Sequence, residues 1–452
     1  MPAATIFALA SGAGRAGVAV IRISGPRALA ALENLSGCSG FSPRRARRID
    51  VRAADGERLD SALALWFPAP HSFTGEDVAE LHVHGGRAVI AGVLAALGRC
   101  AGLRPAAAGE FSRRAVLNGK MDLTQAEGLA DLVAAETAAQ RRQALRQADG
   151  GLRDLCEGWR ARLVRLQAHV EAGIDFGDED AGAADPARVI AIAAELAHLR
   201  SEIETHLADA GRGERLRDGV RVALVGAANA GKSSLLNALV RREAAIVSPQ
   251  PGTTRDVIEV AVDLDGYPVV FADTAGLRET VGEVETEGVR RAQAWAAAAD
   301  LKLVVLDGAL WPDADAASLA LLDTNAIAVI SKVDLRTPAA MDAPGEAPVL
   351  PVRAVAVSAL TGSGLTDLLD ALRREIGQRF AVSEAPVLTR ARHRQAVEAC
   401  AAALSRAGLT AEVPELQAED LRAAADALGR VTGRVDVEQL LDVIFRDFCI
   451  GK

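Results

Sequence analysis

The stretch VRVALVGAANAGKSSLLNAL, residues 220–239, decides the fold of the central part of the chain. Its first six residues are mainly branched and apolar, which predicts a buried strand, and the residues from Lys232 onward have a helical pattern. Between strand and helix stands the pattern Gly226-x-x-x-x-Gly231-Lys232-Ser233. In such a loop, successive backbone N–H groups surround phosphate oxygens, and the N-terminus of the following helix adds a positive dipole end. The strand–loop–helix context therefore predicts a site for a nucleoside triphosphate.

The surrounding residues 218–378 repeat this alternation of strands and helices. The strand runs are rich in valine and isoleucine, and they are VRVALVG, YPVVFADTAG, LKLVVLDG, AIAVISKVD and PVRAVAVSA. Continuous apolar runs of this kind are typical of a mainly parallel sheet covered by helices on both faces. The pattern predicts a P-loop domain of the α/β class.

Two further regions flank this domain. Residues 1–118 contain the strand-like runs GVAVIRISG, SALALWF and DVAELHVHGG and the helical run AVIAGVLAALGRCAG, which predict an N-terminal α+β domain. Residues 119–217 and 379–452 have long helical periodicity. We therefore expect a multidomain chain, α/β plus α, in which the 218–378 domain is inserted into a helical domain. Insertion is feasible because the termini of a compact domain often lie close together.

Composition limits the classes of function that fit. The chain has 452 residues, a net charge of −9 and only 3% aromatic residues. This acidity argues against a protein that binds nucleic acid over its whole surface, so any RNA contact must be local or shared with another protein. The densest basic run holds Arg44, Arg45, Arg47 and Arg48, and such runs are usually solvated loops.

Two other features of the sequence indicate a cytoplasmic protein. The five cysteines are scattered without paired spacing, which argues against a disulfide framework or a zinc ribbon. No apolar run is long enough to cross a bilayer, and the first residues lack a signal-peptide pattern. We expect no membrane partner.

The motifs in and around the phosphate loop indicate which residues would contact the phosphates and the magnesium ion. Lys232 is expected to reach the β- and γ-phosphates, and the Ser233 hydroxyl is expected to bind magnesium. In FADTAG, Asp273 can hold the magnesium ion directly or through water, and the N–H of Gly276 can meet the γ-phosphate. In GTTRD, Thr254 is the candidate for the second magnesium hydroxyl.

The base site favours guanine. Guanine presents two adjacent donors on its Watson–Crick edge, and one carboxylate, that of Asp334 in SKVD, can accept both. The same carboxylate repels the acceptor N1 of adenine, so a generic P-loop ATPase is the least favoured interpretation. The Lys332 stem can cover the base, and the backbone of SAL, residues 358–360, can donate to the guanine O6. Ser331 stands where the usual guanine motif has asparagine, which predicts the loss of one hydrogen bond worth about 0.5–1.5 kcal/mol.

The residue that activates water does not follow the usual pattern. Small GTPases place a glutamine just after DxxG, but Leu277 stands there. Glu285 in GEVETEG is a candidate to orient water, directly or through a second water, although a solvated helix-cap glutamate fits the same pattern. Asn229 in the phosphate loop can hold a monovalent cation beside the phosphates, which would do the electrostatic work of an arginine finger.

With these motifs in place, the chain resembles the tRNA modification GTPase MnmE (TrmE) family over essentially its whole length. The resemblance rests on GRAGVAVIRISG, SFTGEDVAELHVHGG, FSRRAVLNGKMDLTQAEGLADL, IVSPQPGTTRD, DTAGLRE and the terminal FCIGK. It implies an N-terminal tetrahydrofolate-binding and dimerisation domain (1–118), a helical domain (119–217 and 379–452) and an inserted Ras-like GTPase domain (218–378).

The resemblance also implies a reaction and partners. The family acts on tRNA with the flavoprotein MnmG, as a heterotetramer, and adds an aminomethyl- or carboxymethylaminomethyl-type group at carbon 5 of the wobble uridine. The one-carbon unit would come from 5-formyl- or methylene-tetrahydrofolate. GTP hydrolysis would require magnesium and be stimulated by potassium, which joins the GTPase domains of a homodimer.

Individual residues receive roles from the same resemblance. Magnesium would be bound by Ser233 and Thr254, and potassium by Asn229, Ser248, Gln250 and Thr253. Folate would be bound by Arg22, Glu76, Lys120 and Lys452. The catalytic candidates are Glu285, as the water-orienting acid, and Cys449, as a nucleophile or a supporting group, with an incidental thiol as the other interpretation of Cys449. The residues expected to contact GTP are Asn229, Ala230, Gly231, Lys232, Ser233, Ser234, Ser248, Pro249, Gln250, Pro251, Gly252, Thr253, Thr254, Asp273, Thr274, Ala275, Gly276, Ser331, Lys332, Val333, Asp334, Ser358, Ala359 and Leu360.

One alternative from another class remains open at the level of sequence. A GTP-controlled binding switch in RNA or ribosome assembly would use hydrolysis only to time its release. Such a protein needs an RNA-binding module with a basic surface, whereas this chain has the folate-type N-terminal strings and ends in CIGK.

Overall fold

The computed structural model describes residues 4–12, 14–175, 186–243, 258–273, 297–335, 350–380, 387–435, 441, 444–445, 448 and 451. The chain divides into two compact units. The first unit comprises Met1–Ala130, Cys156–Leu163 and Ala425–Lys452, and the second comprises Asp131–Leu155 and Val164–Ala424.

The first unit is built around a six-stranded sheet with the strand order β3-β4-β5-β2-β1-β6. The strands are β1 (Thr5–Leu9), β2 (Ala16–Ser24), β3 (Arg47–Arg52), β4 (Arg58–Phe67), β5 (Val78–Gly85) and β6 (Leu103–Pro105). All neighbouring pairs are antiparallel except β1 with β6. This sheet and its helices confirm the predicted N-terminal α+β region.

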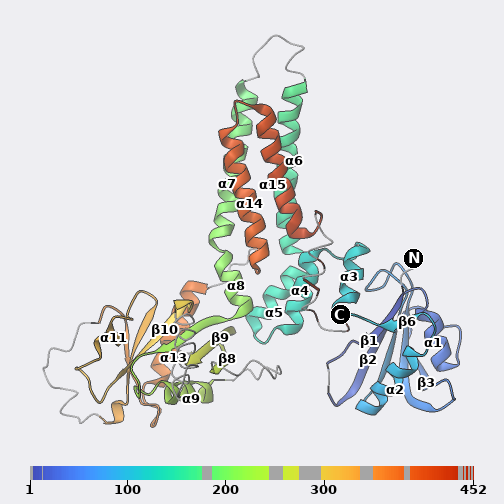
Figure 1. The fold of residues 1–452 in the computed structure, drawn as a ribbon, viewed down its shortest axis with the longest axis horizontal. Coiled ribbons are helices and arrows are strands. Elements are labelled where there is room, and N and C mark those ends of the chain that lie inside the picture. The colour runs from blue at the N-terminus through green and yellow to red at the C-terminus, as the bar shows by residue number, and fades with distance from the viewer. Residues whose placement is uncertain are drawn as a thin grey trace, which may run out of the picture. The chain divides into compact units, whose positions relative to one another are not determined.

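Helices cover this sheet unequally. The helices α1 (Ala28–Ser36) and α2 (Arg87–Gly98) pack on one face, where Ile21 and Leu81 are fully buried (Figure 1). Because side chains alternate along a strand, Arg22 and Glu80 point to the opposite face. That face is covered near β1, where Phe111 of α3 (Glu110–Leu117) packs on strand residues. The helix α4 (Leu123–Ala134) follows α3 in the chain.

The second unit contains another six-stranded sheet, with the order β12-β11-β10-β7-β9-β8. Its strands are β7 (Val220–Val225), β8 (Ile258–Leu264), β9 (Tyr267–Asp273), β10 (Leu301–Asp307), β11 (Ala326–Ser331) and β12 (Ala354–Ala356). Only β8 runs antiparallel to its neighbour, so the predicted mainly parallel sheet is confirmed.

This second sheet is buried on both faces, as its continuous apolar runs predict. On one face, Val222 packs in a core with Leu235 of α9 (Lys232–Arg242) and with α13 (Leu365–Phe380). On the other face, Val304 lies in a smaller core beside α11 (Ala316–Leu319). All the parallel strands therefore bring their carboxyl ends to one edge, where ligands bind in folds of this type.

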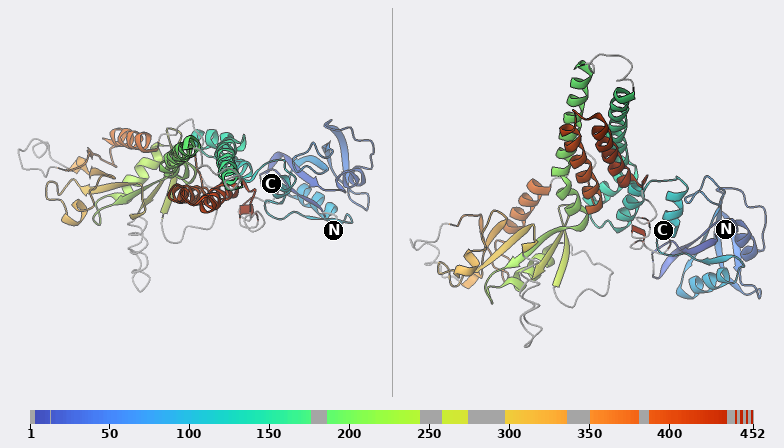
Figure 2. Two further views of the ribbon diagram at one scale, coloured as in Figure 1. Left: turned by 90° about the horizontal axis from the view of Figure 1, so that it is seen from above. Right: turned by 45° about the horizontal axis from the view of Figure 1, so that its top comes forward.

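The remaining elements are helices. They are α5 (Ala138–Ala148), α6 (Gly151–Asp175), α7 (Pro186–Ala208), α8 (Ala210–Asp218), α14 (Ala391–Leu409) and α15 (Pro414–Thr432). In the second unit, α7 and α14 run side by side in every view (Figures 1 and 2). Each of these two helices buries apolar residues at positions i, i+3 and i+7, namely Leu196, Leu199 and Ile203 in α7 and Val397, Cys400 and Leu404 in α14.

Two further properties of the helices bear on function. Burial raises the pKa of the Cys400 thiol to about 12, so this cysteine is a packing residue and not a thiolate nucleophile. Among the helices of the described residues, none combines the length and apolar character that crossing a membrane requires.

Candidate functional site

The phosphate loop joins the end of β7 to the start of α9 and is shaped by two glycines. Gly226 has a φ of +138°, and a Cβ there would lie 2.3 Å from the Val305 carbonyl oxygen, so only glycine fits. Gly231 has a φ of +94° and caps the N-terminus of α9. Between them, Asn229 has a φ of +62°, which asparagine tolerates better than most residues, and its side chain is exposed. The loop thus turns tightly from the end of β7 into α9.

Lys232 lies inside this loop. Its side chain is buried, and its ammonium group donates to the carbonyl oxygens of Gly226 at 3.0 Å and Ala227 at 2.6 Å. Ser233 and Ser234 follow in the first turn of α9, where the helix dipole favours anions. The structure therefore brings a fixed positive charge, two hydroxyls and the loop amides to one place.

Ser331 fastens the phosphate loop to the ends of two strands. Its hydroxyl is buried and lies 2.5 Å from the Ala230 carbonyl oxygen and 3.1 Å from that of Leu306. A hydroxyl has one proton, so it donates to one of these oxygens at a time. The serine that replaces the usual asparagine thus bonds directly to the phosphate loop, which the sequence did not indicate.

The candidate base-recognition residues lie at the carboxyl ends of β11 and β12. Asp334 is exposed in the short 3₁₀ helix Val333–Leu335, directly after Lys332, which has a φ of +53°. Ser358 is fully buried and donates its N–H to the Ser363 carbonyl oxygen at 2.9 Å. The amides of Ala359 and Leu360 are therefore the better candidates for the guanine O6.

A second group of candidate residues lies on the sheet of the first unit. Arg22 on β2 pairs with Glu80 on β5 at 2.9 Å, because the two residues are register partners across the strands. The guanidinium carbon lies 4.9 Å from the ring centre of Phe73 and 5.9 Å from that of Phe111. His82 lies 3.4 Å from the second carboxylate oxygen of Glu80. This is a half-buried ion pair between aromatic rings.

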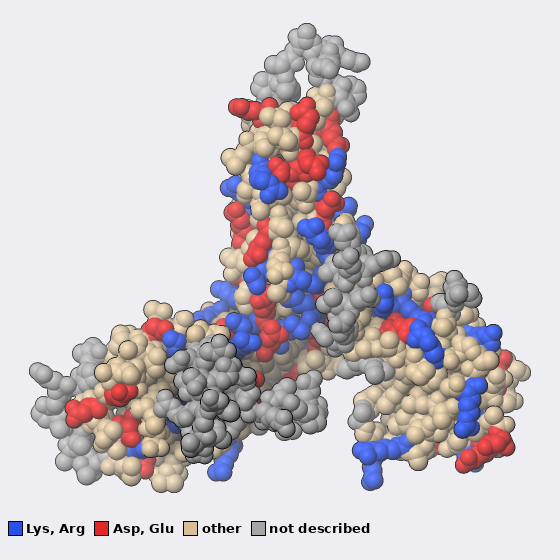
Figure 3. All heavy atoms as spheres, viewed as in Figure 1, with Lys and Arg blue, Asp and Glu red and all other residues tan. Residues whose placement is uncertain are grey.

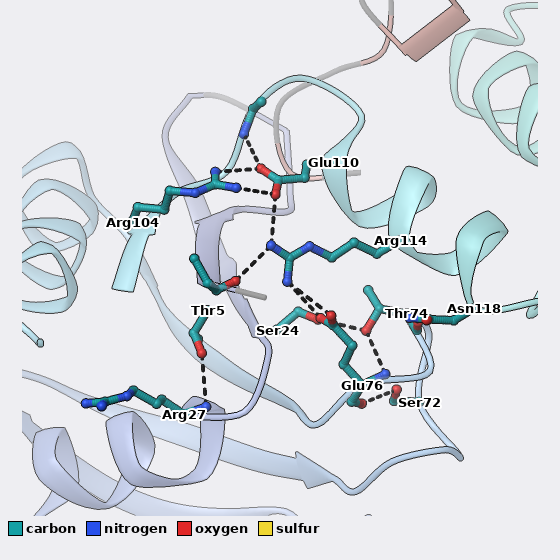
Figure 4. Close-up of polar contacts among 12 residues, drawn as sticks. Thr5, Ser24, Arg27, Ser72, Thr74, Glu76, Arg104, Glu110, Arg114 and Asn118 are labelled. Carbon is teal, nitrogen blue, oxygen red and sulfur yellow. Dashed lines mark hydrogen bonds and ion pairs between the residues drawn. The ribbon is translucent and has the colours of Figure 1, made fainter. Parts of the chain in front are cut away.

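Glu76 belongs to a neighbouring network (Figure 4). Its carboxylate accepts hydrogen bonds from Arg114 at 2.9 and 3.2 Å and from the Ser24 hydroxyl at 2.8 Å. The adjacent Gly75 has a φ of +78°, and a Cβ there would lie 3.2 Å from the Lys120 side chain. Lys120 in turn donates to the Pro70 carbonyl oxygen at 3.0 Å. The structure thus places the Lys120 side chain against Gly75, the neighbour of Glu76, but pairs Arg22 with Glu80.

The same network borders a cavity of about 630 Å³ in the first unit, lined by Glu76, Arg104, Ala107, Ala108, Glu110, Arg113, Arg114, Leu117, Asn118, Leu441 and Phe445. Burial would raise the pKa of Glu110, but hydrogen bonds from Arg104, the Ala107 amide and Arg114 outweigh it and hold the pKa at about 2 (Figure 4). Glu110 is therefore a carboxylate at neutral pH, and it orients Arg104 and Arg114 along the cavity wall.

Comparisons with known proteins match the chain over nearly its whole length. Residues 5–120 match the family model described as the GTP-binding protein TrmE N-terminus, and residues 123–449 match the MnmE helical domain. The tRNA modification GTPase MnmE of Paramagnetospirillum magneticum is 59% identical over 449 residues, which cover 99% of both chains. The human mitochondrial 5-taurinomethyluridine-[tRNA] synthase subunit GTPB3 is 49% identical and covers 99% of this chain and 93% of its own.

The chain belongs to the MnmE family of tRNA modification GTPases. It is accordingly a GTPase involved in tRNA modification.

Several residues that MnmE-type motifs single out lie outside the described residues. They are Ser248, Pro249, Gln250, Pro251, Gly252, Thr253, Thr254, Thr274, Ala275, Gly276, Glu285, Cys449 and Lys452, and only the backbone of Asp273 is described. Gly451, which precedes Lys452, lies against β1, since a Cβ on it would be 2.0 Å from the Leu9 carbonyl oxygen. Leu9 pairs with Ile21, next to Arg22, so the last described residue of this MnmE-family chain lies near the Arg22–Glu80 pair.

Two charged residues of the MnmE-type sites were not found from the sequence. Glu80 stands four residues after Glu76 in the same string, and only the strand register shows which of them meets Arg22. Asp307 ends β10 and binds the Lys332 ammonium group at 2.7 Å, and its other oxygen accepts the Ala309 N–H at 3.0 Å. Asp307 thereby holds the lysine whose stem is expected to cover the base. The signal for it was an aspartate at the carboxyl end of a predicted parallel strand.

Proposed function

We propose that this chain is a potassium-stimulated GTPase that modifies the wobble uridine of tRNA together with an MnmG-type flavoprotein. The group added at carbon 5 is of the aminomethyl or carboxymethylaminomethyl type, and its one-carbon unit comes from 5-formyl- or methylene-tetrahydrofolate. The phosphate loop closed by Lys232 is the observation that carries the GTPase part of this proposal. The printed names of the relatives, a tRNA modification GTPase and a 5-taurinomethyluridine-[tRNA] synthase subunit, support the substrate.

The residues of the second unit suit phosphoryl transfer to water. Lys232 places its charge where the β- and γ-phosphates would lie, and the amides at the start of α9 donate to the phosphate oxygens. The Ser233 hydroxyl stands in the first helical turn, a fitting position for a magnesium ligand, and we propose Thr254 and Asp273 as its companions. Magnesium supplies positive charge that stabilises the leaving phosphate oxygens. We propose that Glu285 orients the attacking water.

The phosphate loop also fits a monovalent cation. Asn229 presents an exposed amide at the tip of the loop, in a left-handed backbone conformation. We propose that its oxygen binds potassium together with Ser248, Gln250 and Thr253. Potassium would supply positive charge beside the phosphates, the task that an arginine finger performs in other GTPases.

Hydrolysis is therefore expected to be at least about tenfold faster in potassium chloride than in sodium chloride at equal ionic strength. The measurement is steady-state phosphate release by the full-length chain. Asn229→Ala is expected to remove most of the difference between the two salts, whereas Asn237→Ala, which changes an asparagine of α9 outside the loop, is expected to preserve it. Equal wild-type rates in the two salts would refute the cation site.

The first unit fits a folate. Arg22 and Glu80 form a half-buried ion pair beside the rings of Phe73 and Phe111, which suits a flat heterocycle that carries donors. We propose that Arg22, Glu76, Lys120 and Lys452 bind tetrahydrofolate and that Glu80 shares the work of recognising the pterin. The position of Gly451 against β1 supports a C-terminus that reaches this site, and with it a role for Cys449 near the one-carbon unit.

The assembly follows from the same proposal. The first 118 residues would bind folate and dimerise. Residues 119–217 with 379–452 would form the helical domain, into which the GTPase domain of residues 218–378 is inserted. Two chains would join two flavoprotein subunits, and potassium would bring the two GTPase domains together.

Analysis of wobble nucleosides in tRNA from cells that lack this protein tests the whole proposal. Uridines modified at carbon 5 are expected to disappear, to return with the wild-type gene, and to stay at less than about a tenth of the wild-type level with Arg22→Ala, because the variant loses a charge-assisted contact to folate. Purified Arg22→Ala protein is expected to hydrolyse GTP at the wild-type rate. An unchanged nucleoside pattern in the deletion strain would refute the proposed function and favour the alternative, a GTP-controlled binding switch in RNA or ribosome assembly.

A further inference from the structure

The first unit carries an excess of positive charge, only part of which the proposed folate site uses. Residues 1–120 contain fifteen lysines and arginines against nine aspartates and glutamates, although the chain as a whole is negative by nine charges. Figure 3 shows Lys and Arg side chains extending from the surface of this unit. The densest group is Arg44, Arg45, Arg47 and Arg48, which we term the arginine edge because β3 is the outermost strand of the sheet. All four side chains are exposed.

The arginine edge is held by neutral partners. Arg44 donates to the His71 carbonyl oxygen, and Arg48 donates to the Ser61 hydroxyl at 3.1 Å. Arg47 donates to the Ser39 carbonyl oxygen at 2.9 Å and lies over the buried ring of Phe41. These contacts fix the directions of three of the four side chains but leave their charges and most of their N–H donors unused.

The next arginines along the same hairpin differ. Arg52 and Arg58 both pair with Asp50, at 3.6 and 3.1 Å. Within the described part of the chain, no carboxylate makes such a pair with the four arginines of the edge. Four arginines without such a pair thus lie close in the chain to two that share one carboxylate, which supplies a control from the same region.

The strand register connects the arginine edge to the proposed folate site. Arg48 pairs with Leu63, Leu63 with His82, and His82 adjoins Glu80. Arg48 and His82 therefore share one face of the sheet and lie two strands apart, about 10 Å. At the other end of the edge, Arg44 donates to the His71 carbonyl oxygen. The preceding residue, Pro70, accepts the hydrogen bond of Lys120. Positive charge therefore lies along one side of the residues proposed to bind folate.

We infer that the arginine edge binds the phosphate backbone of the tRNA whose uridine this chain modifies. The inference rests on the proposed function. Phosphates are the ligands that guanidinium forks match best, and arginines held by neutral groups bind them at a reduced entropic cost. An edge two strands from His82, the neighbour of Glu80, anchors the backbone while one base reaches the one-carbon unit. A local contact of this kind also explains how a chain with a negative net charge can bind RNA.

The test is tRNA binding by the full-length protein, followed by fluorescence anisotropy at several salt concentrations, with tRNA from cells that lack the protein. Replacing the four arginines by glutamine is expected to weaken binding by roughly 30-fold or more and to lower the slope of log K against log salt by about 3, because each lost phosphate contact contributes roughly 0.7–0.9. The double variant R52Q/R58Q is expected to change affinity by less than about threefold, because both of these side chains are engaged by the carboxylate of Asp50.

A second variant separates charge from packing. Replacing the same four arginines by lysine keeps the charge and is expected to stay within about fivefold of the wild-type affinity. A loss as large as that of the glutamine variant would mean that packing around Phe41, and not phosphate binding, had been removed, and the inference would fail.

Two further outcomes decide against the inference. Unchanged tRNA affinity and salt slope in the glutamine variant would overturn it while wild-type tRNA modification left the proposed function intact. Lost affinity for the flavoprotein with retained affinity for tRNA would identify the edge as a surface for an acidic protein. If the wild-type protein, with its flavoprotein, GTP and folate, modified no tRNA at all, the proposed function itself would fail.

Discussion

Lys232→Ala is expected to lower kcat/KM for GTP hydrolysis by about 10³-fold or more, the effect of removing a preorganised charge from the reacting phosphate. The side chain is buried inside the phosphate loop and holds the carbonyl oxygens of Gly226 and Ala227. Its removal therefore takes away both the charge on the phosphates and the two contacts that shape the loop. Single-turnover hydrolysis with the full-length chain measures the loss.

Two controls distinguish this loss from unfolding. Arg241→Ala removes an exposed positive charge from the other end of the same helix, and it is expected to leave hydrolysis within about twofold of the wild type, as surface substitutions usually do. The melting temperature of Lys232→Ala should stay within a few degrees of the wild type, because the large apolar core beneath the loop is unchanged. Hydrolysis at near the wild-type rate in a folded Lys232→Ala protein would remove the phosphate loop from the mechanism.

The phosphate loop was predictable because every part of it is local in sequence. A buried strand, two glycines and a helix start follow one another within twenty residues, and each has its own pattern. The strands β8 and β3 were not predicted, although both belong to the sheets. β8 alternates apolar and acidic residues, and β3 carries three arginines in six residues, so neither reads as the continuous apolar run of a central strand.

The pairing of side chains across the sheet could not be predicted from the sequence. Arg22 and the string holding Glu76 and Glu80 lie more than fifty residues apart, and both glutamates stand in the same motif. A shift of register by one residue moves a side chain to the other face of the sheet, so the partner of Arg22 depends on the register of β2 with β5. The role of Asp307 was not predictable for the same reason. Its contact with Lys332 forms only when β10 and β11 lie side by side.

Asp334→Asn is expected to weaken GTP binding by roughly 10²–10⁴-fold and to improve binding of xanthosine triphosphate. The carboxylate accepts hydrogen bonds from two donors of guanine, and charge-assisted bonds contribute about 1.5–3 kcal/mol each. Asparagine offers one acceptor and one donor, which match the N1–H and the 2-oxo group of xanthine. Competition of GTP, XTP and ATP against a fluorescent guanine nucleotide measures the change.

The reversal of base preference is what makes this prediction specific. A variant that was only less stable would lose affinity for both nucleotides, whereas the exchange of one acceptor for a donor must favour one base over the other. Asp313→Asn, at an exposed aspartate in the same unit outside the proposed base site, is expected to leave both affinities within about twofold of the wild type. If Asp334→Asn kept its preference for GTP, the base would be read by other groups, foremost the amides of Ala359 and Leu360. In that case the ammonium group that Asp307 holds on Lys332 would be the remaining charged group beside the base.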